Sequence, residues 1–201
     1  MSITRTICAI FALTMMSTTA NAGGDVKAGE QKAATCAACH GANGASPNAQ
    51  FPNLAGQVPG YIARQLAMFK SGDRVNAIMK GLADPLSEED MADLDAYYAA
   101  QKPAMRSVSE DQAEVALLGQ DVYRGGYEPL GVAPCISCHG PAGHGIPPQF
   151  PRVSGQYAEY LEQQLLLFKS SERENDIMSP IAFRLSVPQI KQLSLYMSGL
   201  Q

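Results

Sequence analysis

Two copies of the pattern Cys-x-x-Cys-His constrain this chain more than any other feature of its sequence. The first begins at Cys36 and the second at Cys135. This string is the attachment signature of c-type haem, because two thiols one helical turn apart can each add to a vinyl group on one edge of a porphyrin. The histidine that follows then lies under the ring, where its imidazole can bind the iron. The expected thioether residues are Cys36, Cys39, Cys135 and Cys138, and the expected proximal iron ligands are His40 and His139.

Other uses of four cysteines fit this pattern less well. An exported chain could join them as disulfides, but both pairs have the same spacing and both precede a histidine. A structural zinc site needs four ligands around a tetrahedron, and each string supplies three. A thioredoxin-like redox pair accompanies a βαβ pattern, which the sequence lacks. The predicted cofactors are therefore two covalently bound haem c groups with their iron.

The chain repeats itself at a constant offset of 99 residues, the distance from Cys36 to Cys135. About 25 of the 66 residue pairs that start with these two cysteines are identical, without a gap. The segment that leads to the second string is longer by about nine residues, around residues 125–129. We therefore expect two copies of one domain, residues 23–101 and 109–201, joined by a linker at residues 102–108.

Residues 1–22 have the composition of a secretory signal peptide. Arg5 supplies a positive charge, residues 7–16 form an apolar stretch, and residues 20–22 match the Ala-x-Ala pattern of a cleavage site. A buried N-terminal helix is the alternative, but no capping residue or amphipathic period supports it. Cys8 lies inside the apolar stretch, so a lipid anchor at the start of the mature chain is not indicated. The mature protein is expected to begin at Gly23 and to be exported.

Composition excludes several classes of protein. The chain has 201 residues, a formal charge of −4 and a pI near 5.3, whereas a nucleic-acid-binding protein needs a basic face. No apolar run reaches the ~18–20 residues that a membrane-spanning helix requires.

Aromatic residues make up only 7% of the chain and tryptophan is absent. Side chains alone give a domain of this size a modest core, to which a porphyrin would add apolar bulk.

Both copies have the pattern of helices, and no alternating strand pattern of useful length occurs. Ser87 and Ser186 are expected to cap two of these helices, with Gln189 in the capping-box position of the second. Apolar residues recur at helical spacing after each cap. The predicted fold class is therefore all-α. The expected helices cover residues 25–34, 59–71, 87–101, 109–124, 156–170 and the segment from residue 186 onward.

The second axial ligand follows by elimination. His144 is the only histidine left, and it lies five residues after His139, too close to reach the opposite face of the same haem easily. Methionine is the usual alternative. Under the 99-residue offset only Met79 and Met178 superimpose, each 39 residues after its histidine, and they are the predicted axial ligands. The methionines expected in helix cores instead are Met68, Met91 and Met197.

Identical residues near the two predicted sites are candidates for supporting roles. The prolines after the two strings are expected to orient the histidine rings through a backbone carbonyl. The arginines and asparagines before the two methionines either form hydrogen bonds near the haem or shape the preceding loop, and the sequence leaves both roles open. These pairs are Pro52 with Pro151, Arg74 with Arg173, and Asn76 with Asn175.

The combination of motifs resembles the dihaem cytochrome c4 family over the whole mature chain. The two haem strings, the methionine in each half and a Phe-Pro-x-Leu/Val-x-Gly-Gln run from Phe51 and from Phe150 carry the resemblance. The resemblance implies two class I cytochrome c domains related by a pseudo-twofold axis, with haem propionates facing across the interface. It also implies a periplasmic carrier of single electrons, soluble or loosely attached to the inner membrane. Its partners would be redox proteins: an upstream cytochrome complex or small donor protein, and a downstream terminal cytochrome oxidase.

Two rival functions bear on this interpretation. A peroxidase needs an open iron position, and thiosulfate-oxidising dihaem enzymes resemble a pattern with a cysteine ligand, but the mature chain has no cysteine outside its two strings. We therefore expect an electron-transfer protein without a small-molecule substrate, not an enzyme. The dihaem subunit of a flavocytochrome c sulfide dehydrogenase would have a similar chain, and no sequence feature excludes it.

Charge differs between the two halves of the mature chain. Residues 23–107 carry eight basic and nine acidic residues, a net charge of −1, whereas residues 108–201 carry six and ten, a net charge of −4. Opposite charges steer protein partners together. The second half is therefore expected to prefer a partner with a basic surface.

Signal-peptide cleavage gives the first testable prediction. N-terminal sequencing of the exported protein should begin at Gly23. Ala22→Arg should block processing, because the cleavage site requires a small residue there, whereas Asn21→Arg changes the tolerant middle position and should be processed as before. Intact-mass measurement distinguishes the two forms, and an exported wild-type chain that keeps residues 1–22 would contradict the prediction.

Overall fold

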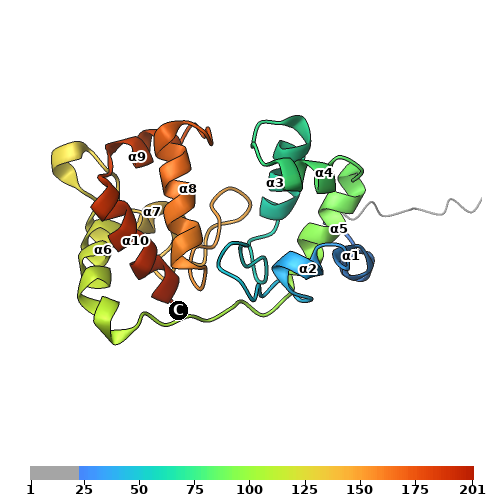
Figure 1. Cartoon of the computed structure of the whole chain (residues 1–201), viewed down its shortest axis with the longest axis horizontal. Helices are drawn as coiled ribbons and strands as arrows, with labels where there is room; N and C mark the ends of the chain where they lie inside the picture. The colour runs from blue at the N-terminus through green and yellow to red at the C-terminus, as the bar shows by residue number, and fades with distance from the viewer. Residues whose placement is uncertain (1–22) are drawn as a thin grey trace, which may run out of the picture.

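The computed structural model describes residues 23–201, so the predicted signal peptide and Cys8 lie outside the described residues. This part of the chain folds as two helical lobes that lie side by side (Figure 1). It contains no β-strand, only two isolated bridges, one between Tyr127 and Val132 and one between Ile146 and Phe150. The all-α class expected from the sequence is confirmed.

The first lobe contains helices α1 to α5. Helix α5 is its centre, because both α1 and α3 pack against it, and α3 also contacts α4. Sequence periodicity did not indicate α2 and α4, which span four and seven residues and are too short to show a helical period. The bounds are α1 Val26–Ala33, α2 Ala37–His40, α3 Tyr61–Ser71, α4 Ala77–Ala83 and α5 Glu88–Ala99.

The second lobe repeats this arrangement with α6 to α10. Helix α10 packs against α6 and α8, and α8 contacts α9. The helix expected at residues 109–124 is divided into a 3-10 turn and α6, which ends at Gly125. The additional residues before the second string form η2 and the bridge of Tyr127 with Val132. The bounds are η1 Glu110–Gln112, α6 Ala113–Gly125, η2 Glu128–Leu130, α7 Ile136–His139, α8 Ala158–Ser170, α9 Met178–Arg184 and α10 Val187–Gly199.

Capping side chains set where the last helix of each lobe begins. The Ser87 hydroxyl accepts a hydrogen bond from the Asp90 amide, and the Asp90 carboxylate accepts one from the Ser87 amide. Ser186 and Gln189 make the same reciprocal pair at α10. Both capping boxes satisfy amide groups that the first helical turn leaves unpaired, and they confirm the two helix starts expected from the sequence.

A glycine permits the closest helix crossing in each lobe. A Cβ at Gly29 of α1 would overlap the backbone carbonyl of Asp93 in α5, and a Cβ at Gly119 of α6 would overlap that of Gln192 in α10. The two glycines lie 90 positions apart rather than 99. This difference of nine residues is the insertion that the sequence shows before the second string.

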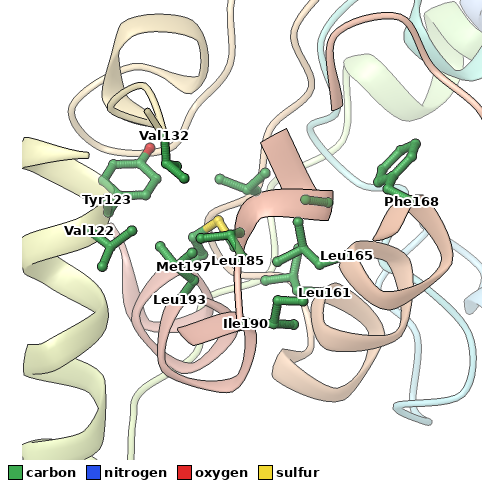
Figure 2. Packing of buried hydrophobic residues seen from close by; sticks show 12 residues of the cluster. Val122, Tyr123, Val132, Leu161, Leu165, Phe168, Leu185, Ile190, Leu193 and Met197 are labelled. Atoms are coloured by element: carbon green, nitrogen blue, oxygen red, sulfur yellow. The ribbon is translucent and has the colours of Figure 1, made fainter. Parts of the chain in front are cut away.

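Each lobe has its own apolar core beside its predicted haem string. In the second lobe Tyr123, Ile190 and Leu193 are fully buried (Figure 2), and Cys135 and Met178 pack against this cluster. In the first lobe the corresponding cluster includes Met91, Leu94 and Tyr98, with Cys36 and Met79 packed against it. The predicted haem-binding residues therefore lie at the edge of each core and not inside it.

Hydrogen bonds between the lobes are reciprocal. The Gln57 side chain accepts from the Arg152 amide (2.7 Å) and donates to the Arg152 carbonyl (3.2 Å). The Gln156 side chain does the same with the amide (2.9 Å) and the carbonyl (3.0 Å) of Asn53. Because Gln156 and Arg152 are the repeat counterparts of Gln57 and Asn53, each contact has a symmetry-related twin, as an isologous interface requires. The two lobes are thus related by a pseudo-twofold axis.

The segment between α5 and η1 lies along this interface. Residues 102–109, which include the predicted linker, contain no helix and run along the lower edge of the view in Figure 1. Pro103 contacts Gly56 so closely that a Cβ there would overlap its ring. The Arg106 guanidinium lies 3.2 Å from the centre of the Tyr157 ring. Among the described residues, no helix has the length and apolar character needed to cross a membrane.

The close packing of α6 against α10 at Gly119 predicts that two glycines of α6 respond differently to substitution by alanine. Gly119→Ala should lower the free energy of unfolding by about 1–3 kcal/mol, because overpacking forces the two helices apart. Gly125→Ala in the same helix is the control, since nothing lies within 4 Å of a Cβ there, and its effect should stay within about 0.5 kcal/mol. Thermal unfolding of both variants tests the crossing, and equal stabilities would contradict it.

Candidate functional site

All eight residues predicted from the sequence to bind haem line one cavity of about 1100 Å³ that extends across both lobes. Sites for a single small molecule are usually about 300–1,000 Å³, so this volume exceeds what one ligand needs. The sequence placed the two sites in separate domains, and the structure shows that their walls are continuous. The residues are Cys36, Cys39, His40 and Met79 from the first lobe, and Cys135, Cys138, His139 and Met178 from the second.

The two haem strings adopt the same local structure. Each forms a single helical turn, α2 or α7, which places both thiols on one side and the histidine at its end. Gly41 and Gly140 stop these turns with φ angles of 78° and 79°, a conformation that glycine adopts without steric cost. The four cysteines of the described chain form no disulfide. Burial raises the pKa of the Cys135 thiol to about 11, the opposite of the lowered pKa found in a thiol redox pair.

A backbone carbonyl orients each histidine. The Nδ1 atom of His40 lies 2.9 Å from the Pro52 carbonyl, and that of His139 lies 2.9 Å from the Pro151 carbonyl. A carbonyl can only accept, so Nδ1 carries the proton and the Nε2 lone pair is free for a metal. Burial lowers the pKa of both rings more than this bond raises it. Both imidazoles are therefore neutral, the form that binds iron, and the role predicted for the two prolines is confirmed.

An asparagine fixes the start of the helix that carries each methionine. The Asn76 side-chain oxygen accepts from the Met79 amide at 2.9 Å, and the Asn175 oxygen accepts from the Met178 amide at 2.8 Å. Of the two roles left open by the sequence, the asparagines thus shape the loop before each methionine.

The other methionines differ in their surroundings. Met91 and Met197 are buried in the cores, as expected. Met68 is only half-buried and lies on the cavity wall, where its sulfur is 3.7 Å from the Gln65 side-chain nitrogen. The expectation of a core position for Met68 is therefore wrong, because the helix face that carries it borders the cavity. Its repeat counterpart is Leu167, so Met68 lacks the twofold match that Met79 has.

Sequence reasoning missed one residue of the first site. Tyr98 is 1% exposed and lines the cavity, and its hydroxyl has no hydrogen-bond partner among the described residues. Met197 occupies the same position in the second lobe. The sequence did contain a signal, because Tyr98 and Met197 differ at a position where the repeat places both on a core helix. The helical pattern alone does not show which side of that helix borders a cavity.

Comparison with known proteins decides the family. Residues 26–101 match the family model described as Cytochrome c. Cytochrome c4 of Pseudomonas aeruginosa is 42% identical over 186 residues, which cover 90% of this chain and 91% of that protein. The chain belongs to the cytochrome c4 family. The crystal structure of reduced recombinant cytochrome c4 from Pseudomonas stutzeri superposes with a TM-score of 0.85 at 38% identity, covering 89% of this chain and 100% of that one.

Membership of the cytochrome c4 family confirms the fold and the cofactors expected from the sequence. The protein consists of two c-type cytochrome domains and carries two covalently bound haem c groups. It is an electron-transfer protein, not an enzyme, and its partners are redox proteins. The cavity fits the cofactor, because each lobe contributes two thiols, a neutral imidazole and a thioether to its wall. The role of each individual ligand stays a prediction.

Another relative has a different name. A protein from Thiomonas intermedia called thiosulfate dehydrogenase electron acceptor is 36% identical over 173 residues, covering 84% of this chain and 79% of that one. Relatives of this chain therefore include a protein named as the electron acceptor of a thiosulfate dehydrogenase.

The predicted methionine ligands can be tested one at a time. Met79→Ala should abolish the sulfur-to-iron absorption band of one haem and lower its reduction potential, because thioether ligation raises the potential. The second haem should keep its band. Met68→Leu is the control, since it installs the residue found in the second lobe, and it should leave both bands in place. Optical spectra and redox titration provide the measurement, and an unchanged band in the Met79 variant would rule out ligation by Met79.

Proposed function

We propose that this cytochrome carries single electrons through the periplasm from a respiratory-chain donor to a terminal cytochrome oxidase. The observation that supports this proposal most directly is the pairing of one histidine and one methionine on the wall of each haem site. With Cys36, Cys39, His40 and Met79 holding the first haem, and Cys135, Cys138, His139 and Met178 the second, neither iron has a position for a substrate. The haem groups supply one-electron chemistry.

The residues of this chain act by holding the groups and shaping their surroundings. The thiols attach each porphyrin, and Pro52 and Pro151 keep the histidine Nε2 atoms pointing into the cavity. Apolar side chains from both cores exclude water from the cavity wall, which together with thioether ligation sets the reduction potential. The continuous cavity brings the two groups close together, so an electron entering one domain can leave from the other.

Charge supports a different partner for each domain. Glu172 and Glu174 are exposed at the wall of the second site, whereas Val75, the counterpart of Glu174, is 81% exposed at the first. We infer that the acidic second domain docks a redox protein with a basic surface. The wall of the first domain carries the basic residues Lys32 and Arg64 and has a valine in place of Glu174, so this domain suits a partner that does not present a basic surface.

A periplasmic location belongs to the same proposal and is supported by membership of the cytochrome c4 family. The N-terminal pattern of this chain predicts a cleaved signal peptide. The two haem attachment strings are consistent with an exported chain. Loose association with the inner membrane belongs to the same proposal, because a terminal oxidase is a membrane protein.

A second candidate function has a specific observation in its favour. The similarity to the thiosulfate dehydrogenase electron acceptor of Thiomonas intermedia supports reduction of this protein by a thiosulfate dehydrogenase. The dihaem subunit of a flavocytochrome c sulfide dehydrogenase is a further alternative, and co-purification with a flavoprotein would favour it.

One experiment separates the donors and the acceptor. Reduced holoprotein is mixed with a purified terminal oxidase, and haem reoxidation is followed in the presence of oxygen. We expect rapid reoxidation that is first order in oxidase, and its absence would overturn delivery to the oxidase. In the reverse direction, oxidised holoprotein is mixed with thiosulfate dehydrogenase and thiosulfate, and rapid haem reduction would support the second candidate.

The charge difference predicts a dependence on salt. Electron exchange with a small basic cytochrome should slow as ionic strength rises, because screening weakens the attraction. Glu174→Val, which installs the residue found at position 75, should flatten this dependence, whereas Val75→Glu in the first domain is the control and should leave it nearly unchanged. Stopped-flow rates at several salt concentrations provide the measurement. A wild-type slope for Glu174→Val would count against docking through the second domain.

A further inference from the structure

One buried polar group on the wall of the first haem site is left unpaired by the polypeptide. The Tyr98 side chain is 1% exposed and lines the cavity, and its hydroxyl has no hydrogen-bond partner among the described residues. The other buried side-chain atom of residues 23–201 without a partner belongs to Arg106, which does not line the cavity. Leaving a buried hydroxyl unpaired is costly, so the position of Tyr98 calls for a partner inside the first haem site.

Close packing fixes the position of the Tyr98 ring. A Cβ at Gly44 would lie 2.7 Å from a ring carbon of Tyr98, so the ring packs directly on the glycine backbone. The Tyr98 carbonyl accepts a hydrogen bond of 2.8 Å from the Gly56 amide. The Tyr97 ring packs edge-on against the Tyr98 ring, with 5.1 Å between the ring centres. These contacts hold the ring in place, and they therefore also hold its hydroxyl.

The Tyr98 hydroxyl lies beside the sulfur of Cys36, the first cysteine of the first haem string. Burial raises the pKa of the Cys36 thiol, and the hydroxyl opposes this rise through a hydrogen bond. Burial and the neighbouring Cys36 together raise the pKa of Tyr98 far above its ordinary value. The hydroxyl of Tyr98 therefore keeps its proton and can donate it to an acceptor.

Attachment of a haem decides which of these two groups donates. A free thiol can donate its hydrogen or accept one. When the thiol adds to a vinyl group, a sulfur–carbon bond replaces the sulfur–hydrogen bond, and the hydrogen goes to the other vinyl carbon. The sulfur of the resulting thioether can only accept. A hydrogen bond between this sulfur and Tyr98 therefore requires the hydroxyl to donate, with the positive end of its dipole towards the haem.

The second domain has a different arrangement beside its first cysteine. Met197 occupies the position of Tyr98 under the 99-residue offset, and it has no hydroxyl. Tyr123 of α6 is near enough to Cys135 to affect its own pKa, but its hydroxyl donates to the Gly140 carbonyl at 2.7 Å. Its proton is therefore already bound by the polypeptide. The two sites have the same predicted ligands, but they differ in the hydroxyl that is available to the first cysteine.

We propose that the Tyr98 hydroxyl donates a hydrogen bond to the Cys36 sulfur in the holoprotein and thereby raises the reduction potential of the first haem. Hydrogen bonds next to a haem and the burial of the site are among the factors that set its potential. The positive end of the hydroxyl dipole favours the added electron. Tyr98 acts through the cysteine and is not itself an iron ligand. This inference rests on haem attachment at Cys36 and not on the identity of the electron donor or the oxidase.

The test removes the hydroxyl of Tyr98 and keeps its ring. In the Tyr98→Phe holoprotein, the reduction equilibrium of the first haem should shift by at least about threefold towards the oxidised form. The reduction equilibrium of the second haem should change by less than about 1.5-fold, because Met197 stands at the corresponding position there. Redox titration follows both haems, and the step that Met79→Ala moves furthest identifies the first. An unchanged first haem, or equal shifts of both haems, would overturn the proposal.

Tyr97→Phe is the matched control in the same helix. The Tyr97 hydroxyl donates to the Ala42 carbonyl at 3.0 Å, and neither of these residues lines the cavity. Removing this hydroxyl should leave both reduction equilibria within about 1.5-fold of their wild-type values. If Tyr97→Phe shifts the first haem as far as Tyr98→Phe does, the shift reports a loss of packing around the helix, and the proposal fails.

Proton NMR of the reduced holoprotein tests the contact itself. A hydroxyl that donates to the sulfur should give a slowly exchanging proton resonance with cross-relaxation to the Cys36 β-protons, and Tyr98→Phe should lack this resonance. A hydroxyl proton that exchanges rapidly and shows cross-relaxation to water alone would overturn the contact with Cys36. All of these measurements use purified holoprotein without an oxidase, so their failure would leave the proposed electron delivery intact.

Discussion

The structure depends on one constraint, which is that each domain of fewer than 100 residues must enclose a flat apolar group that its own side chains only partly surround. The helices provide a core on one side, with Leu94 and Tyr98 in the first domain and Ile190 and Leu193 in the second. On the other side the haem strings and the methionine helices line a cavity of about 1100 Å³. A small domain gains little stability from side-chain burial alone, so the cofactor is part of the core.

Short elements that pack against the cores position the predicted iron ligands. A single helical turn carries each pair of cysteines and its histidine, and a proline carbonyl twelve residues later fixes the tautomer of the ring. An asparagine holds the start of the methionine helix in the same way in both domains. Each contact joins a side chain that is identical in the two copies to a backbone group, so the other differences between the copies leave it unchanged.

The interface between the domains combines two kinds of polar contact, one made to backbone groups and one made by charged side chains. Gln57 and Gln156 bind backbone groups of the opposite domain, so these contacts are complete within the polypeptide. Arg74 and Arg173 form the second kind, because they have no carboxylate partner in the described chain and donate to Gln65 and Gln164 side chains of both domains. Both kinds of contact occur in symmetry-related pairs, so together they set the relative orientation of the domains.

The sequence by itself determined the duplication, the all-α class, the haem strings, the helix caps and the pairing of Met79 with Met178. These features are local or depend on a constant offset, so they can be read without knowing which segments meet. Only the tertiary structure decided that the two sites share one cavity, that Met68 lies on its wall and that Tyr98 faces the first site. It also decided that Arg74 meets Gln164, and Arg173 meets Gln65, across the pseudo-twofold axis. The physical reason is that these contacts join residues about 90 to 110 positions apart, and a repeat shows that such residues are equivalent but not that they touch.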